Sequence, residues 1–129
     1  MSGSIGIAMR VGTDITEVCR IRELMNRRPE FRPTVFTTRE IDYCESKRRT
    51  FEHYAARFSA KESVMKAMGR GWLQGLEWTD IEIARRASGE PFIVAGSSLQ
   101  AAMQQLGLSR FVVSLSHCST HATAVVIAL

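Results

Sequence analysis

The sequence predicts an α+β fold with a largely antiparallel sheet. Three observations predict it: a long helical pattern covers residues 50–68, alternating apolar segments lie near both ends of the chain, and the predicted order is strand, helices, strands, helix, strands. A chain of 129 residues has the usual length of one domain. We therefore expect residues 1–129 to form a single domain.

The first predicted strand covers residues 5–15, where isoleucine, methionine and valine alternate with small or polar residues. A Gly-Thr-Asp segment interrupts this alternation, which places Asp14 at the end of the strand. A helix follows over residues 17–28 because its apolar residues recur on one face, and Pro29 and Pro33 end it.

The middle of the chain is predicted to hold two further helices. Thr37 and Glu40 have the spacing of a capping box, so a short helix is expected to run to about Ser46. The long helix over residues 50–68 then ends at Gly69, a residue that favours the left-handed conformation of a helix C-terminus.

The second half changes to strand patterns. A loop over residues 71–78 carries both tryptophans, and a predicted hairpin joins residues 79–84 to 92–95. Ser97 is expected to cap a helix that Gly107 closes. The chain then ends in two strands, over residues 110–117 and 121–129.

Composition restricts the partners and the compartment. The formal net charge of +4 favours an anionic partner, which could be a nucleic acid, a phosphorylated metabolite or an acidic protein. Nucleic acid is disfavoured because the arginines do not alternate with aromatic residues. Three cysteines without a CxxC spacing favour a reducing cytoplasm, and no apolar run approaches the roughly 20 residues that span a membrane.

One carboxylate falls inside the apolar stripe of the long helix. Glu62 lies near the centre of that stripe, with Lys61 and Lys66 on its two sides. A surface Glu–Lys pair is the alternative interpretation. Burial of a carboxylate costs several kcal/mol unless it is paired, protonated or bound to a metal, which favours a functional role. The stripe consists of Phe51, Ala55, Phe58, Glu62 and Met65.

Asp14 is a second candidate carboxylate, and Gly12 before it permits a close approach of the backbone. Asp14 could instead cap the next helix. Two carboxylates without a nearby His or Cys ligand suit magnesium, which keeps several waters and takes further oxygens from a phosphate. The lysines beside Glu62 would then be phosphate ligands.

Five segments together resemble a known family. They are VGTDITEVCRI, FTTREIDYC, YAARFSAKESVMKAMGRG, DIEIARRASGEP and VVSLSHCSTHATAVVIA. Nearly from end to end, the chain resembles the holo-[acyl-carrier-protein] synthases, the small trimeric class of 4'-phosphopantetheinyl transferases. The resemblance implies this transferase fold, with the sheet packed against the long helix, in a homotrimer with sites between subunits.

The resemblance also implies an activity. The phosphopantetheine arm of coenzyme A would be transferred to a serine of an acidic apo acyl carrier protein, in support of fatty acid or polyketide synthesis, with release of adenosine 3',5'-bisphosphate. Asp14 and Glu62 would bind magnesium on the pyrophosphate, and Lys66 would neutralise charge at the attacked phosphorus. The acceptor of the serine proton stays open between Glu62 and a metal-bound water.

Further residues match binding positions of the family. The coenzyme-contacting positions correspond to Arg57, Lys66, Gly69, Pro91 and His117, together with Arg48 and Arg49, which would reach the ligand of a neighbouring subunit. Arg20 and Arg27 match the surface that docks the carrier. A solvated basic link is the alternative for Arg48 and Arg49, and plain surface charge is the alternative for Arg27.

The chain departs from the family pattern at Arg70, Glu90, Cys118 and His121, none of which is a core catalytic position. Glu90 lies near the expected coenzyme cleft and bears on its local charge. Two other functions are weighed: a non-catalytic module that binds an acidic protein, and a magnesium-dependent phosphohydrolase on the same two carboxylates.

Overall fold

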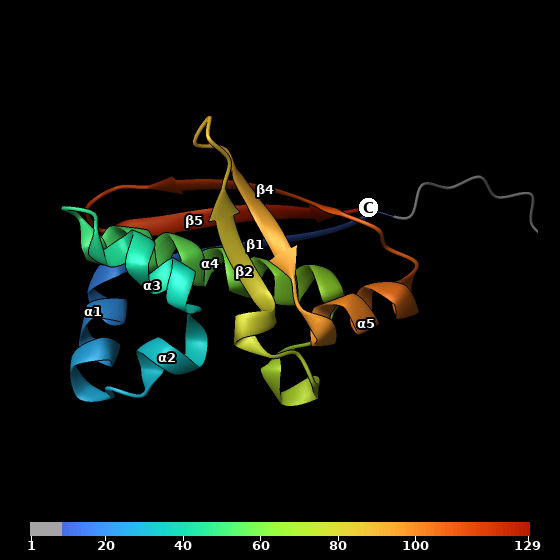
Figure 1. Ribbon diagram of the computed structural model, residues 1–129, viewed down its shortest axis with the longest axis horizontal. Helices are drawn as coiled ribbons and strands as arrows, with labels where there is room; N and C mark the ends of the chain where they lie inside the picture. Colours follow the sequence, from blue (N-terminus) through green and yellow to red (C-terminus); the bar gives the residue numbers. More distant parts are fainter. Residues whose placement is uncertain (1–8) are drawn as a thin grey trace, which may run out of the picture.

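Figure 1 shows the computed structural model, which describes residues 9–129. Within residues 9–129, the first half contains one strand and four helices, and the second half contains four strands, two 3-10 turns and one helix. The elements are β1 (Arg10–Glu17), α1 (Val18–Arg27), α2 (Phe31–Val35), α3 (Thr38–Glu45), α4 (Thr50–Met68), η1 (Trp72–Gln74), η2 (Trp78–Asp80), β2 (Ile81–Arg85), β3 (Pro91–Ala95), α5 (Ser97–Leu106), β4 (Phe111–His117) and β5 (His121–Ala128).

Two antiparallel sheets and a central helix build the domain. Strands β1, β5 and β4 form one sheet in that order, and β2 pairs with β3 in a separate hairpin. Helix α4 lies along one face of the three-stranded sheet and contacts α1 and α3 on its other sides (Figure 1). The predicted α+β class with antiparallel pairing is confirmed.

Helix α4 is buried around most of its circumference. One apolar cluster contains Val64 from this helix together with residues of the sheet and α5, and a second contains Tyr54 together with residues of α1 and α3. The prediction that one stripe faces the core is therefore wrong in part. Phe58 and Glu62, in that stripe, are only half-buried, because this side of α4 borders a cavity.

Strand β1 continues through the Gly-Thr-Asp segment to Glu17. Asp14 pairs with Ala124 of β5, so it lies inside the strand and not at its end, which corrects the prediction. Residues 5–8 of the predicted strand lie outside the described residues. Asp14 does not cap α1 either, since the N-cap position is Glu17 and no side chain caps this helix.

Most predicted helix ends are confirmed. The capping box of α3 is present, with Thr37 Oγ1 accepting from the Glu40 amide at 3.2 Å and Glu40 Oε1 accepting from the Thr37 amide at 2.9 Å. Helices α4 and α5 end at Gly69 and Gly107, whose φ angles of 71° and 70° are left-handed.

Two local predictions differ from the structure. Helix α2 forms around Pro33 because a proline in the first turn needs no intrahelical N–H donor. The N-cap of α5 is Gly96 and not Ser97. Asp80, from η2, supplies the missing cap by accepting from the Ser98 amide at 2.9 Å, a contact that depends on the tertiary fold.

Cys19, Cys44 and Cys118 are all unpaired thiols. Within residues 9–129, none of the helices combines the length and the apolar character needed to cross a bilayer.

Candidate active site

The close contact between β1 and α4 builds the candidate site. A Cβ atom on Gly12 would lie 1.9 Å from the carbonyl oxygen of Ser63, so no larger residue fits at this crossing without a shift of the backbone. The strand therefore passes directly against the helix. This contact brings Asp14 of β1 next to Lys66 of α4.

Four hydrogen bonds orient Asp14 and Lys66. Lys66 Nζ donates to Asp14 Oδ1 at 3.2 Å and to the Thr13 carbonyl at 3.0 Å. Asp14 Oδ2 accepts from Thr16 Oγ1 at 2.8 Å and from Ser59 Oγ at 3.0 Å. Lys66 thus pairs with Asp14, whereas the alternative interpretation had paired it with Glu62, and the carboxylate of Asp14 has a fixed direction.

Glu62 lies within electrostatic reach of Asp14 and Lys66. Burial raises the pKa of the Glu62 carboxyl, and the negative charge of Asp14 raises it further, whereas Lys66 and Arg20 oppose the shift. The repulsion between Glu62 and Asp14 requires the two carboxylates to lie within electrostatic reach of each other. A cation between them would relieve this repulsion.

The donor set fits a hard cation with few protein ligands. Residues 9–129 contain no group of three or more His, Cys, Asp or Glu side chains arranged to hold a metal. Asp14 and Glu62 provide two carboxylates, and magnesium is commonly held by one or two carboxylates together with waters and substrate phosphates. These residues therefore suit magnesium only together with a phosphate-bearing ligand.

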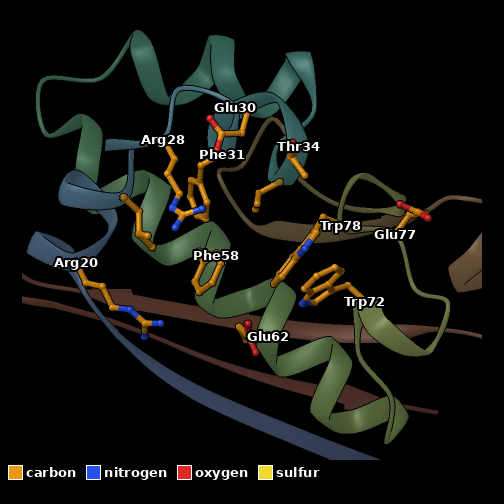
Figure 2. A pocket seen from close by; sticks show the side chains of 12 residues that line it. Arg20, Arg28, Glu30, Phe31, Thr34, Phe58, Glu62, Trp72, Glu77 and Trp78 are labelled. Carbon is orange, nitrogen blue, oxygen red and sulfur yellow. The ribbon is translucent and has the colours of Figure 1, made fainter. Parts of the chain in front are cut away.

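A cavity of about 730 Å³ opens beside Glu62, and we call it the aromatic cavity. Figure 2 shows Arg20 and Arg28 on one side, Trp72 and Trp78 on the other, and Glu62 at its lower end. The rings of Phe58 and Trp78 stack with centroids 5.4 Å apart. The residues that line the aromatic cavity are Arg20, Leu24, Arg28, Glu30, Phe31, Thr34, Val35, Phe58, Glu62, Trp72, Glu77 and Trp78.

A second cavity, of about 400 Å³, shares Trp72 and Glu62 with the first. Glu62, Lys66 and Gly69 line it, as does Arg70, one of the departures from the family pattern. Gly69, predicted to contact the coenzyme, therefore shares a cavity with two of the three predicted catalytic residues. Trp72 borders both cavities and is 56% exposed.

Arg57 lies in a different place. It is 1% exposed, its guanidinium stands 4.0 Å above the ring of Tyr43, and it lines a cavity of about 360 Å³ together with Phe92, the neighbour of Pro91. Among residues 9–129, Arg57 Nε and Nη1 have no hydrogen-bond partner. Buried guanidinium groups are normally paired, so these atoms point to a ligand.

The other predicted nucleotide residues also lie apart from Glu62. His117 Nδ1 is 2.9 Å from Glu52 Oε1, and Arg48 and Arg49 line a further cavity, of about 330 Å³. Nine residues separate Arg57 from Lys66 on α4, which places their side chains on opposite faces, about 180° apart. One subunit therefore does not bring all the predicted coenzyme contacts together.

The predicted carrier-binding arginines differ in position. Arg20 lines the aromatic cavity, whereas Arg27 is exposed at the end of α1 and does not line it. Sequence reasoning missed Arg28 and the two tryptophans as lining residues. A signal was present, since a loop with two tryptophans follows the helix that carries Glu62.

The fold and this site define a class of transferases. The profile of the 4'-phosphopantetheinyl transferase superfamily matches residues 10–126, and the chain belongs to this family. Within it, the chain belongs with the holo-[acyl-carrier-protein] synthases. It is 40% identical over 119 residues to the synthase of Caldanaerobacter subterraneus subsp. tengcongensis, with 92% of this chain and 93% of the relative covered.

Solved structures show the same relationship. The holo-[acyl-carrier-protein] synthase of Neisseria meningitidis superposes with a TM-score of 0.84 at 29% identity, over 93% of this chain and 97% of that one. The Helicobacter pylori synthase in complex with coenzyme A gives 0.81 at 27% identity, over 92% and 99%. The predicted fold and family are therefore confirmed.

Proposed function

We infer that the protein transfers the 4'-phosphopantetheine group of coenzyme A to a serine of apo acyl carrier protein and releases adenosine 3',5'-bisphosphate. The observation that carries this function is the match to named synthases over nearly the whole chain, which includes both elements that form the site. The holo carrier produced would serve fatty acid or polyketide synthesis.

Asp14 and Glu62 are the proposed magnesium ligands. When bound, the ion would neutralise charge on the pyrophosphate of coenzyme A as a Lewis acid. The support is that the two carboxylates repel each other and line two open cavities that share Lys66, one with Glu62 and the other with Asp14. Thr16 and Ser59 hold one oxygen of Asp14, which orients the other toward Lys66.

Lys66 is the proposed phosphate ligand at the reacting centre. Its side chain is 55% exposed while its ammonium is held by Asp14 and the Thr13 carbonyl, so it can reach an incoming phosphate without a change of backbone. Phosphoryl transfer depends mainly on positioning and charge stabilisation, and the nucleophile here is the carrier serine. The protein therefore needs no nucleophile of its own.

The aromatic cavity is the proposed docking site of the carrier. Glu30, Glu62 and Glu77 also line it, so the support comes from its one side, where Arg20 and Arg28 lie together and suit an acidic protein surface (Figure 2). Its aromatic rings suit apolar residues of that surface. The cavity ends at Glu62, so a serine presented there would meet the pyrophosphate. Arg27 would contribute to steering from outside the cavity.

We propose a homotrimer in which the coenzyme binds between subunits. The separation of Arg57, His117, Arg48 and Arg49 from Lys66 supports it, because one copy can bind the pyrophosphate while its neighbour holds the nucleotide. The outward face of the three-stranded sheet is also apolar and exposed, as subunit contacts require. Its exposed apolar residues are Val11, Ile15, Val112 and Val125.

Mass spectrometry of the carrier tests the proposed activity. Incubation with coenzyme A, magnesium and apo carriers of the fatty acid and polyketide types should add one phosphopantetheine group to at least one carrier. Phosphate release without a carrier would instead indicate a phosphohydrolase. Carrier binding without any mass gain would indicate a binding module. Native mass spectrometry of the same sample tests the trimer.

A further inference from the structure

Lys61 and Glu40 form a buried ion pair outside the catalytic group. Lys61 Nζ lies 2.8 Å from Glu40 Oε1, and both side chains are 0% exposed. Lys61 was expected beside the phosphate site, but it lines neither of the cavities that Glu62 borders. It therefore cannot bind phosphate without unfolding its surroundings.

The pair is satisfied by backbone groups of three elements. Lys61 Nζ also donates to the carbonyls of Trp78, at 3.0 Å, and of Ile81. Glu40 accepts from the amide of Thr37 at the start of α3 and from the amide of Ile83 in β2, both at 2.9 Å. One ion pair thus connects α3, α4 and the segment from η2 into β2.

The two carbonyls that Lys61 holds lie at the two ends of η2. Trp78 begins this turn, and Ile81 directly follows it. The outer side of the turn is held separately, by Asp80, which accepts from the Ser98 amide. Lys61 therefore holds the inner side of η2, a short turn that has no apolar core of its own.

Trp78 connects this attachment to the aromatic cavity. Its ring stacks on Phe58, with centroids 5.4 Å apart and an interplanar angle of 22°, and Phe58 lies one helical turn before Glu62. Figure 2 shows the Trp78 ring beside Trp72 on the cavity wall above Glu62. A displaced Trp78 carbonyl would move this ring and change the shape of the cavity.

We propose that the buried Lys61–Glu40 pair positions Trp78 as a wall of the aromatic cavity. Lys61 and Glu40 are then positioning residues for the carrier protein that docks there. The docking part rests on the proposed function, whereas the placement of Trp78 does not. Replacing both charges should leave a folded protein with a misplaced wall. Buried ion pairs can often be exchanged for uncharged side chains without loss of the fold.

Fluorescence tests the placement of Trp78 without any substrate. The chain contains two tryptophans, so Trp72→Phe leaves Trp78 as the single emitter. Adding Lys61→Met and Glu40→Gln to this variant should shift the emission to longer wavelength and increase quenching by acrylamide. The amide side chain introduced by Glu40→Gln retains an oxygen for one of the two backbone amides, which helps the double replacement to fold.

Kinetics with the native tryptophans test the functional part. Lys61→Met with Glu40→Gln should raise the KM for the carrier about tenfold and change kcat much less, because the wall is displaced while the reacting groups stay in place. Tyr54→Phe is the matched control. It removes a buried hydroxyl whose hydrogen bond goes to Glu45 of α3 and not to Trp78, and it should leave this KM unchanged.

The outcomes separate the placement of Trp78, its effect on the carrier and the proposed function. Unchanged Trp78 emission and quenching in the folded double variant would overturn the positioning role. Changed fluorescence with a KM equal to that of the Tyr54→Phe control would overturn the link to the carrier. If the double variant does not fold, Trp78→Ala in the native chain is measured in its place. An unchanged KM for the carrier in that variant would contradict the role of Trp78 as a cavity wall that the carrier contacts. Absence of transfer by the unaltered protein would refute the proposed function instead.

Discussion

Two lysines five residues apart on α4 have opposite environments. Lys61 is fully buried, and its ammonium bonds to Glu40 and two backbone carbonyls. Lys66 is 55% exposed and pairs with Asp14 at the edge of open cavities. The first ammonium has no room for a further ligand, whereas the second can exchange a partner for a phosphate.

The difference concerns how completely the charges are compensated. Around Lys61, both carboxylate oxygens of Glu40 and the Lys61 ammonium have protein partners, and the pair holds elements of the fold together. Around Lys66, the pKa of Glu62 is raised by burial and by Asp14, so the unliganded protein carries uncompensated negative charge. Such incompletely compensated groups in a cavity are typical of functional sites.

Replacing Glu62 should have the largest effect on activity. Glu62→Gln removes one proposed magnesium ligand, and we expect kcat to fall about a thousandfold because charge stabilisation worth several kcal/mol is lost. The raised pKa of Glu62 means that its ionised form destabilises the fold at pH 7, so the variant should unfold at a higher temperature than the parent without ligand. Mass spectrometry and thermal unfolding measure the two effects.

Asp42→Asn is the control for this variant, since Asp42 is an exposed carboxylate on α3 that borders none of the described cavities. Its activity should equal that of the parent. Retained turnover in Glu62→Gln would contradict the metal-binding role, and a lowered unfolding temperature would contradict the uncompensated charge.

Replacing only Lys61 should have the largest effect on stability. Lys61→Met leaves the carboxylate of Glu40 buried without its partner, which should lower the free energy of unfolding by about 3 to 5 kcal/mol. Urea unfolding measures the loss. Lys66→Met should change it by less than about 1 kcal/mol because the Lys66–Asp14 pair is partly solvated. Equal losses would remove the contrast between the two lysines.

Replacing Gly12 tests the close contact between β1 and α4, the helix that carries both Lys61 and Lys66. In Gly12→Ala the new Cβ would meet the Ser63 carbonyl oxygen at 1.9 Å and the Ala67 amide nitrogen at 2.7 Å. The strand must then move away from the helix, at a cost of about 1 to 3 kcal/mol. Urea unfolding should show this loss, and turnover should fall because Asp14 moves away from Lys66. An unaltered unfolding midpoint would contradict the close contact.

The smallest expected effect is the pH dependence contributed by His53. Burial, together with His117 and Arg57, lowers the pKa of His53 to about 4, against 6.5 in an unfolded chain. Between these values the unfolded chain binds more protons, so stability falls as the pH drops from about 6.5 to 4. His53→Gln should remove this contribution, so the free energy of unfolding should depend less steeply on pH. Urea unfolding at pH 4.5 and 7.5 measures this slope. An identical slope would contradict the shift.

Sequence patterns predicted the elements well where the determinants are local. The capping box at Thr37 and the left-handed glycines Gly69 and Gly107 depend on neighbouring residues, and all are confirmed. Asp14 was predicted to lie at the end of the first strand, because the pattern could not show that β5 pairs with β1 as far as Glu17. The cap of α5 by Asp80 likewise comes from a distant turn.

The sequence by itself determined the family, the class of fold and the presence of a carboxylate that does not suit its helix. Only the tertiary structure decided which lysine accompanies that carboxylate. On a wheel, Lys61 and Lys66 lie on the two sides of the stripe that contains Glu62. The partners that separate them, Glu40 from α3 and Asp14 from β1, arrive through packing. A helical pattern states which residues share a face, but burial and charge compensation depend on what the rest of the chain places against that face.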